Sequence, residues 1–166
     1  MATAGHNLSN YDKSNLPNGA RFRVGIVVSK WNESITSGLL DGALEVLHAA
    51  GVPEDQCVVQ SVPGAFELPM ACQWMLESSP EVDAVIAIGA VVRGETAHFD
   101  FVCQAASMGI LRAGMDSGKP TIFCVLTDDN MDQSIARSGG ALGNKGIEAA
   151  VACLEMLALK HRIFPS

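Results

Sequence analysis

The fold is decided by the stretch Asp83-Ala-Val-Ile-Ala-Ile-Gly-Ala-Val-Val92, which runs directly into the polar turn Arg93-Gly94-Glu95-Thr96. A continuous apolar run of this kind is typical of a strand that is buried on both faces of a parallel sheet. The turn leads into a helical pattern with one apolar side, formed by Phe99, Val102, Cys103, Ala106 and Ile110. We therefore predict a strand, a glycine-containing turn and a helix, an arrangement in which α/β proteins bind ligands at free backbone N–H groups.

The same alternation of strand and helix extends over most of the chain. Apolar runs predict strands at residues 22–28, 57–61, 84–92 and 120–127. Helical periodicity predicts helices at residues 34–50, 66–77, 96–115 and 143–160, and a short helix after Asn130. Strands separated by helices imply right-handed crossovers and a parallel sheet covered on both faces. The predicted fold is α/β, a three-layer αβα domain whose four-stranded parallel sheet has the flavodoxin-like order 2-1-3-4.

Composition limits the classes of function. The chain of 166 residues is long enough for one domain with a buried core, predicted at residues 22–166, and the polar residues 1–21 predict an N-terminal arm. The net charge of −7 argues against a nucleic-acid partner, which requires a basic face. No apolar stretch is long enough to span a membrane, and the lack of a cationic leader with an apolar segment predicts a cytoplasmic protein.

Apolar residue types suggest how the surface is used. The mean hydropathy of +0.23 predicts apolar surface hidden between subunits, with a well-filled core as the alternative. The five cysteines lack any Cys-x-x-Cys pair, which favours small buried side chains over metal ligands or disulfides. The scattered methionines are interpreted as core residues, and Trp74 as a core or interface residue.

A histidine, His98, falls in the first turn of the helix that follows the strand at residues 84–92. Imidazole titrates near neutral pH, so an anion-binding turn beside it is a candidate catalytic corner. The alternative is an ordinary strand–turn–helix with a surface histidine, since such turns are common in this fold class.

The segment Gly89-Ala-Val-Val-Arg-Gly-Glu-Thr-Ala-His-Phe99 resembles the signature of the lumazine synthase family. These enzymes make 6,7-dimethyl-8-ribityllumazine in riboflavin biosynthesis. Three further stretches are similar to the family in the same order: Trp31-Asn32, Val62-Pro-Gly-Ala-Phe-Glu-Leu-Pro69 and Gly143-Asn-Lys-Gly146. The resemblance covers residues 22–159 and implies the same fold as the apolar pattern does.

The resemblance also implies a reaction. In that family 5-amino-6-(D-ribitylamino)uracil is joined to 3,4-dihydroxy-2-butanone 4-phosphate, both small molecules. An amine condenses with a ketone, phosphate is eliminated, and the ring closes with loss of water. No redox step occurs, so the resemblance implies neither a redox cofactor nor a metal ion. The protein has to hold a flat pyrimidine, a polyol and a phosphate, and it has to move protons.

Roles for individual residues follow from the resemblance. His98 is implied as the proton donor and acceptor. Contacts to the pyrimidine and its ribityl chain are implied for Trp31, Ala65, Phe66, Glu67, Ala90, Val91, Val92 and Phe123. Contacts to the phosphate are implied for Glu95, Thr96, Arg137 and Lys145. The first two of these residues serve through backbone N–H groups, and the guanidinium of Arg137 reaches two phosphate oxygens at once.

Several of these residues also have a purely structural interpretation. Trp31 can be a partly buried side chain that closes the end of the sheet, and Glu67 a carboxylate favoured by a helix dipole. Without the resemblance, Arg137 is a solvated arginine at a helix end. Arg93 and Asp100 flank His98, and they either tune it or form a surface ion pair.

The resemblance implies an assembly. Active sites of the family lie between adjacent subunits of a ring of five, which makes a monomer inactive. One subunit then supplies Phe123, Arg137 and Lys145. Its neighbour supplies Trp31, Glu67 and His98. The link at residues 138–143 is short, as in members that build twelve pentamers into a hollow shell.

Two other functions remain open from the sequence. One is a flavin- or nucleotide-binding module without catalysis, for which Trp31 would supply a stacking surface. The other is a shell protein whose main role is to form a compartment. A phosphate-receiver domain is disfavoured, because the strand at residues 84–92 offers no acceptor aspartate.

Overall fold

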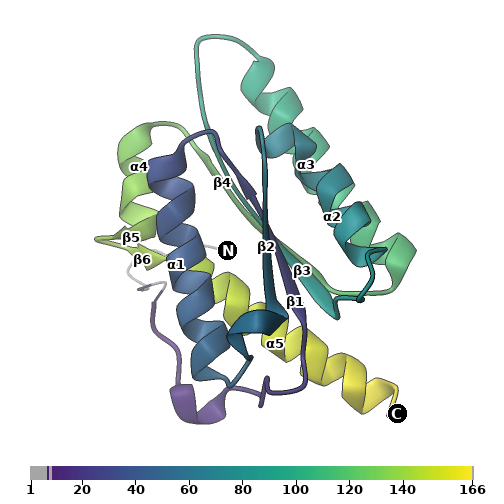
Figure 1. Ribbon diagram of the computed structural model, residues 1–166. Coiled ribbons are helices and arrows are strands. Elements are labelled where there is room, and N and C mark those ends of the chain that lie inside the picture. The colour runs from purple at the N-terminus through teal and green to yellow at the C-terminus, as the bar shows by residue number, and fades with distance from the viewer. Residues whose placement is uncertain (1–6, 8, 166) are drawn as a thin grey trace.

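The computed structural model describes residues 7 and 9–165, and Figure 1 shows a parallel sheet with helices packed on it. The sheet contains β1 (Val24–Ser29), β2 (Cys57–Val62), β3 (Ala84–Val92) and β4 (Thr121–Asp128). Its order is β2-β1-β3-β4, and all neighbouring strands are parallel. The predicted fold class and strand order are confirmed. Because the strands are parallel, all their carboxyl ends lie at the same end of the sheet, which we call its carboxyl edge.

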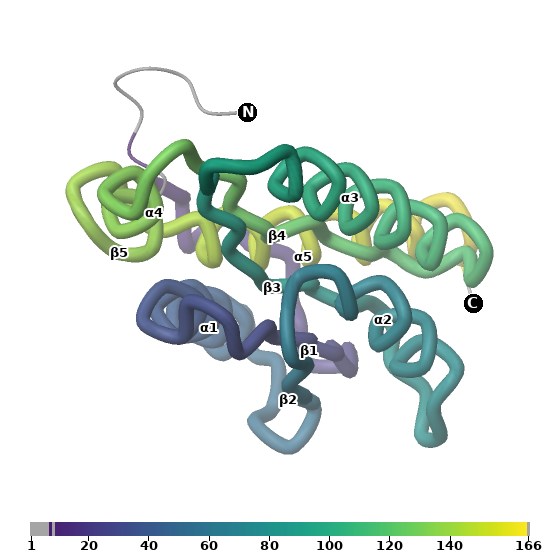
Figure 2. The backbone as a smooth tube through the Cα atoms, turned by 90° about the horizontal axis from the view of Figure 1, so that it is seen from above, coloured from purple at the N-terminus to yellow at the C-terminus, as the bar shows by residue number. Residues whose placement is uncertain are grey.

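Helices cover both faces of the sheet. The longer ones are α1 (Glu33–Ala49), α2 (Leu68–Leu76), α3 (His98–Ser117) and α5 (Lys145–Ile163). Seen from above in Figure 2, the sheet runs between α1 on one side and α2 and α3 on the other. Alternate strand residues divide between two cores: Ile26 and Ile86 pack with α1 and α5, whereas Val27 and Ala87 pack with α2 and α3. This two-sided burial explains why the strands are continuous apolar runs.

Short elements complete the chain. Helix α4 (Met131–Arg137) follows β4, and single 3-10 turns occur at Lys13–Asn15, Glu54–Gln56 and Ala65–Glu67. A hairpin of β5 (Ser138–Gly140) and β6 (Gly143–Asn144) was not predicted. Its strands have three and two residues, mainly glycine, so they show no alternation of apolar and polar side chains.

The start of α5 is held tightly against α1. Asn144 accepts a hydrogen bond from Gly146 N at 2.8 Å and donates one to the Gly38 carbonyl at 2.7 Å. A Cβ atom added at Gly146 would overlap the carbonyl oxygen of Leu39. The motif Gly143-Asn-Lys-Gly146 is therefore a helix cap and a close helix–helix contact as well as a carrier of Lys145.

The interpretation of the methionines as core residues was wrong. Only one described methionine, Met75, is buried, and five are exposed: Met70, Met108, Met115, Met131 and Met156. Trp74 is 66% exposed, which excludes the core interpretation, and its interpretation as an interface residue stays a prediction. These side chains lie on the outward faces of helices, where helical periodicity does not distinguish a core side from a side that contacts another chain.

The cysteines behave mostly as predicted. Cys72, Cys124 and Cys153 are buried, Cys57 and Cys103 are half-buried, and all five carry free thiols. Burial raises the pKa of Cys72, Cys124 and Cys153 to about 12, so these thiols stay protonated at neutral pH. They are unsuited to act as nucleophiles.

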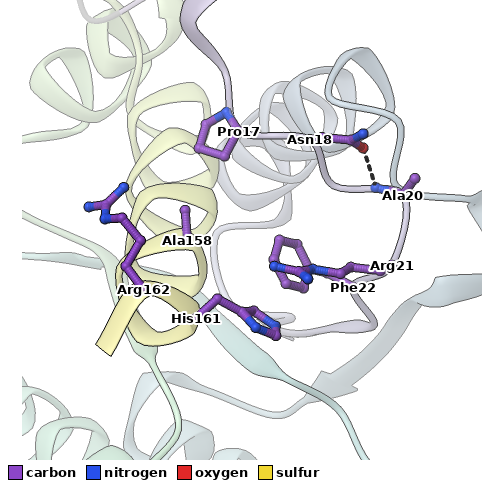
Figure 3. Close-up of a pocket in the computed structure, with 8 residues that line it drawn as sticks. All are labelled: Pro17, Asn18, Ala20, Arg21, Phe22, Ala158, His161 and Arg162. Atoms are coloured by element: carbon purple, nitrogen blue, oxygen red, sulfur yellow. Dashed lines mark hydrogen bonds between the residues drawn. The ribbon is translucent and has the colours of Figure 1, made fainter. Parts of the chain in front are cut away.

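Of the predicted arm at residues 1–21, residues 1–6 and 8 lie outside the described residues. Gly19 N donates to the Ala50 carbonyl at 2.8 Å, and Tyr11 and Leu16 pack against the core. Residues 17–22 and the end of α5 line a cavity of about 510 Å³, in which His161 faces Phe22 (Figure 3). Phe22 precedes β1, so this cavity lies at the amino ends of the strands, away from the predicted site. No helix among the described residues is both long and apolar enough to cross a membrane.

Candidate active site

The turns after β1 and β2 are joined at the carboxyl edge of the sheet. Trp31 N donates to the Pro63 carbonyl at 3.2 Å, one residue after Lys30 N bonds the Val62 carbonyl at 2.9 Å. A Cβ atom at Gly64 would lie 3.4 Å from Trp31 Cδ1 and 3.2 Å from Glu67 Oε2. The fold therefore brings Trp31 and Glu67 together around a glycine that leaves room for both.

Asn32 connects the turn after β1 to the end of β3. Its side-chain Nδ2 donates to the Ala90 carbonyl at 2.9 Å, and its backbone is left-handed, with φ of 59°. Asparagine tolerates this conformation better than most residues do. The strand ends that carry Trp31 and Ala90–Val92 are thus fixed to each other.

Exposure separates the residues that offer side chains from those that offer backbone. Trp31 is 72% and Phe66 60% exposed, although both are large aromatic residues. Ala65 and Ala90 are buried and can present only backbone groups to a ligand. Val91 and Val92, at the end of β3, have half-buried side chains.

Glu67 is partly engaged within the chain. Its Oε2 accepts a hydrogen bond from Gly64 N at 2.8 Å, which stabilises the turn after β2. Among the described residues no hydrogen bond reaches its Oε1. The carboxylate thus combines the structural interpretation, a carboxylate at the start of a helical segment, with one oxygen left for a ligand.

His98 is the first residue of α3, which confirms its predicted place in the first helical turn, and its side chain is exposed. Its N–H donates to the Thr96 hydroxyl at 3.4 Å. Within residues 7 and 9–165, no group accepts a hydrogen bond from the backbone N–H of Glu95 or Thr96. The turn before α3 therefore presents free N–H donors and an imidazole side by side, which suits an anion.

Arg93 and Asp100, which flank this turn, form an ion pair. Arg93 Nη1 lies 3.3 Å from Asp100 Oδ1, and Arg93 Nε lies 3.0 Å from Asp129 Oδ1. The guanidinium carbon also lies 4.1 Å above the Phe99 ring. Both ion pairs are exposed.

A second group of predicted residues lies elsewhere. Phe123 and Lys145 line a groove of about 320 Å³ along the free edge of β4, beside α5. Lys145 pairs with Glu148 in this groove. Because β4 and β2 are opposite edges of the sheet, the fold of one chain does not bring this group to Trp31 and Glu67.

Arg137, the last residue of α4, has its guanidinium fixed by contacts within the chain. Its Nη1 donates to the Gln133 carbonyl at 2.8 Å and lies 3.9 Å from Asp128 Oδ1. Asp128 is buried and also accepts a hydrogen bond from the Ser134 hydroxyl at 2.7 Å. The guanidinium is thus oriented by α4 and by the end of β4.

Known proteins similar to this chain agree on one family. The family model described as 6,7-dimethyl-8-ribityllumazine synthase matches residues 21–161. A protein of that name from Christiangramia forsetii is 51% identical, over 96% of this chain and 95% of the relative. Relatives with the same name from Flavobacterium johnsoniae and Porphyromonas gingivalis are 52% and 51% identical. They cover 98% and 97% of this chain and 85% and 99% of their own lengths.

The chain belongs to the lumazine synthase family. Sequence reasoning gave no role to three residues that hold the site of this lumazine synthase together, namely Asn32, Asp128 and Asp129. Asp128 and Asp129 directly follow a buried strand, and this position at a carboxyl end is a signal that sequence reasoning did not use. Asn32 had been noted only as part of a motif.

Among the described part of the chain, no three His, Cys, Asp or Glu side chains are placed to hold a metal ion together.

Proposed function

We propose that this chain condenses 5-amino-6-(D-ribitylamino)uracil with 3,4-dihydroxy-2-butanone 4-phosphate to give 6,7-dimethyl-8-ribityllumazine and phosphate. The observation that carries the proposal is the turn before α3, where exposed His98 adjoins the free N–H groups of Glu95 and Thr96. Further support comes from the family match over residues 21–161 and from relatives about 50% identical that bear the enzyme's name.

The pyrimidine is assigned to the edge formed by the ends of β1, β2 and β3. Trp31 stacks on the flat ring, since its exposed face gains from covering an aromatic ligand. Backbone groups of Ala65, Phe66 and Ala90 meet the edge of the ring, and Val91 and Val92 pack along it. Glu67 accepts hydrogen bonds from ribityl hydroxyls through its Oε1.

The phosphate is assigned to the N–H groups of Glu95 and Thr96 and to cations of a neighbouring subunit. Arg137 supplies two donors in a fixed fork, and Lys145 supplies a second positive charge. The family resemblance makes Arg137 the main phosphate partner, and Lys145 also pairs with Glu148 within its own chain.

His98 is assigned the proton transfers. Condensation of an amine with a ketone needs protonation of the departing oxygen and removal of a proton from nitrogen. Elimination of phosphate needs removal of a proton from carbon. An imidazole titrates near neutral pH and so serves as acid and base in turn.

The shared site is supported by the separation of the two groups of residues on one chain. Phe123 and Lys145 lie at the β4 edge, and Trp31 and Glu67 lie across the sheet. In a ring of five, the β4 edge of one subunit meets the strand ends of the next. The short link at residues 138–143 favours the 60-subunit shell over the single pentamer. A cytoplasmic location stays an expectation from the sequence.

The purified protein is expected to be a pentamer or larger, with the 60-subunit shell favoured. Many large apolar side chains are exposed on the single chain, and burying them between subunits removes apolar surface from water. Light scattering and electron microscopy measure the particle size. A fully active monomer would contradict the shared site.

The direct experiment mixes purified protein with both substrates and follows the fluorescent lumazine together with released phosphate. We expect one phosphate per lumazine. Binding of riboflavin without lumazine formation would instead favour the binding-module alternative. Particles without either activity would favour the shell protein.

Changing Arg137 to alanine is expected to raise the KM of the phosphorylated four-carbon substrate tenfold or more. A charge-assisted hydrogen-bonded fork to phosphate is lost, at a cost of about 1.5–3 kcal/mol. Arg137→Lys should restore only part of the affinity, because it keeps the charge without the fork. Separate KM values for the two substrates check this. A rise confined to the pyrimidine would reassign the phosphate to Lys145.

A further inference from the structure

We propose that Arg93 is a positioning residue for the loop that carries Glu95, Thr96 and His98. We call the contacts of Arg93 with Asp100, Asp129 and Phe99 the Arg93 clamp. The inference rests on the proposed function, since it assigns the clamp a role at that same site. In this role Arg93 touches no substrate and acts by holding the anion-binding N–H groups and the imidazole in place.

Arg93 fixes both sides of the loop, through its backbone before the loop and through the clamp after it. Before the loop, Arg93 N donates to the Asp128 carbonyl at 2.9 Å, so the end of β3 is fixed to the end of β4. After the loop, the guanidinium pairs with Asp100 at 3.3 Å and covers the Phe99 ring at 4.1 Å. His98 directly precedes these two residues, so the start of α3 is drawn toward Arg93.

Packing alone does not hold the loop. Residues 93–98 are all exposed, and a Cβ atom at Gly94 would meet nothing within 4 Å. The first buried residue after this exposed segment is Phe99, and the Arg93 guanidinium covers its ring. The loop therefore depends on polar contacts for its shape. The Arg93 clamp supplies the side-chain contacts between the loop and residues outside it.

The anchor of the clamp is itself fixed. Asp129 pairs with Arg93 Nε at 3.0 Å, and Asp129 N donates to Gln133 Oε1 at 3.0 Å. Asn130 caps the same helix, accepting a hydrogen bond from Gln133 N at 3.0 Å. Through Asp129, Arg93 thus links the loop to α4, which lies outside the strand–turn–helix unit.

An arginine suits this position for a geometric reason. Its planar guanidinium pairs with two carboxylates from different elements and stacks on an aromatic face at the same time, whereas an ammonium group lacks this planar fork. Exposed ion pairs add little to global stability, so loss of the clamp should leave the fold intact. The expected effect is a displaced loop, and small displacements of reacting groups are costly for turnover.

The test compares Arg93→Gln, Asp129→Asn and the double variant with the wild-type enzyme. The matched control is Arg112→Gln, which breaks an exposed ion pair with Asp116 farther along α3. For Arg93→Gln we expect kcat/KM for the phosphorylated substrate to fall about 10-fold to 100-fold. The KM of the pyrimidine and the thermal midpoint should match those of the control.

Two further results separate positioning from a general structural role. The double variant should be no worse than the worse single variant, because both changes remove the same contact. Arg93→Lys should recover part of the activity, since it keeps one ion pair. Unchanged kinetics in Arg93→Gln, or a fall in the thermal midpoint with equal losses for both substrates, would overturn the proposal. Absence of lumazine formation by the wild-type enzyme would instead refute the proposed function.

Discussion

Replacing His98 with alanine is expected to slow kcat about 100-fold while leaving the KM of the pyrimidine substrate near its wild-type value. A general acid–base group contributes about 10²–10⁴-fold, and amine–ketone condensation also proceeds slowly unaided, which favours the low end. His98 is exposed at the first residue of α3, so its loss leaves no cavity in the core. Steady-state kinetics with both substrates measure the effect.

The matched control is His161→Ala, at the far end of the sheet beside Phe22. This change should leave kcat unaltered, because His161 lies at the amino ends of the strands. The two variants should therefore differ in kcat although each removes one imidazole. Unaltered turnover in His98→Ala would remove His98 from the proposed mechanism.

Changing Gly146 to alanine is expected to destabilise the folded chain by about 3 kcal/mol, the upper part of the range for overpacking. The new Cβ overlaps the backbone carbonyl of Leu39, and a backbone atom cannot move aside as a flexible side chain can. Relief requires α1 and α5 to separate, which would also break the hydrogen bond from Asn144 to Gly38. Denaturant and thermal unfolding of variant and wild type under matched conditions measure the loss.

Gly94→Ala is the control for stability, since a Cβ there meets nothing within 4 Å. Its unfolding midpoint should stay close to that of the wild type. Equal stability of Gly146→Ala and Gly94→Ala would mean that α1 and α5 are not in close contact at this point. A loss of stability in both would point to a general intolerance of alanine for glycine in this chain.

Parts of the fold followed from local pattern, and parts did not. The run from Ala84 to Val92 was correctly predicted as a strand, because burial on both faces leaves a continuous apolar signature. The hairpin at residues 138–144 was missed, since its glycine-rich strands have no such signature. The exposed methionines, such as Met108 and Met115, were wrongly placed in the core, because an apolar helix face does not reveal which surface covers it.

Part of the candidate site was also predictable from the sequence, and part was not. The strand–turn–helix around His98 is a local feature, and the order of strand ends placed Trp31, Glu67 and His98 at one edge of the sheet. The contacts that hold this edge were not predictable. Asn32 bonds Ala90 across 58 residues, and Arg93 pairs with Asp129 across 36.

By itself the sequence determined the αβα class, the strand order and the turn that carries His98, because periodicity and turn chemistry act between neighbours along the chain. Only the tertiary structure decided that Asn32 bonds the Ala90 carbonyl and that Gly146 faces the backbone of Leu39. Such pairs are set by strand register and helix packing, which join distant segments at distances of a few ångströms. No local pattern of residues specifies those distances, so they emerge only when the whole sheet and its helices are assembled.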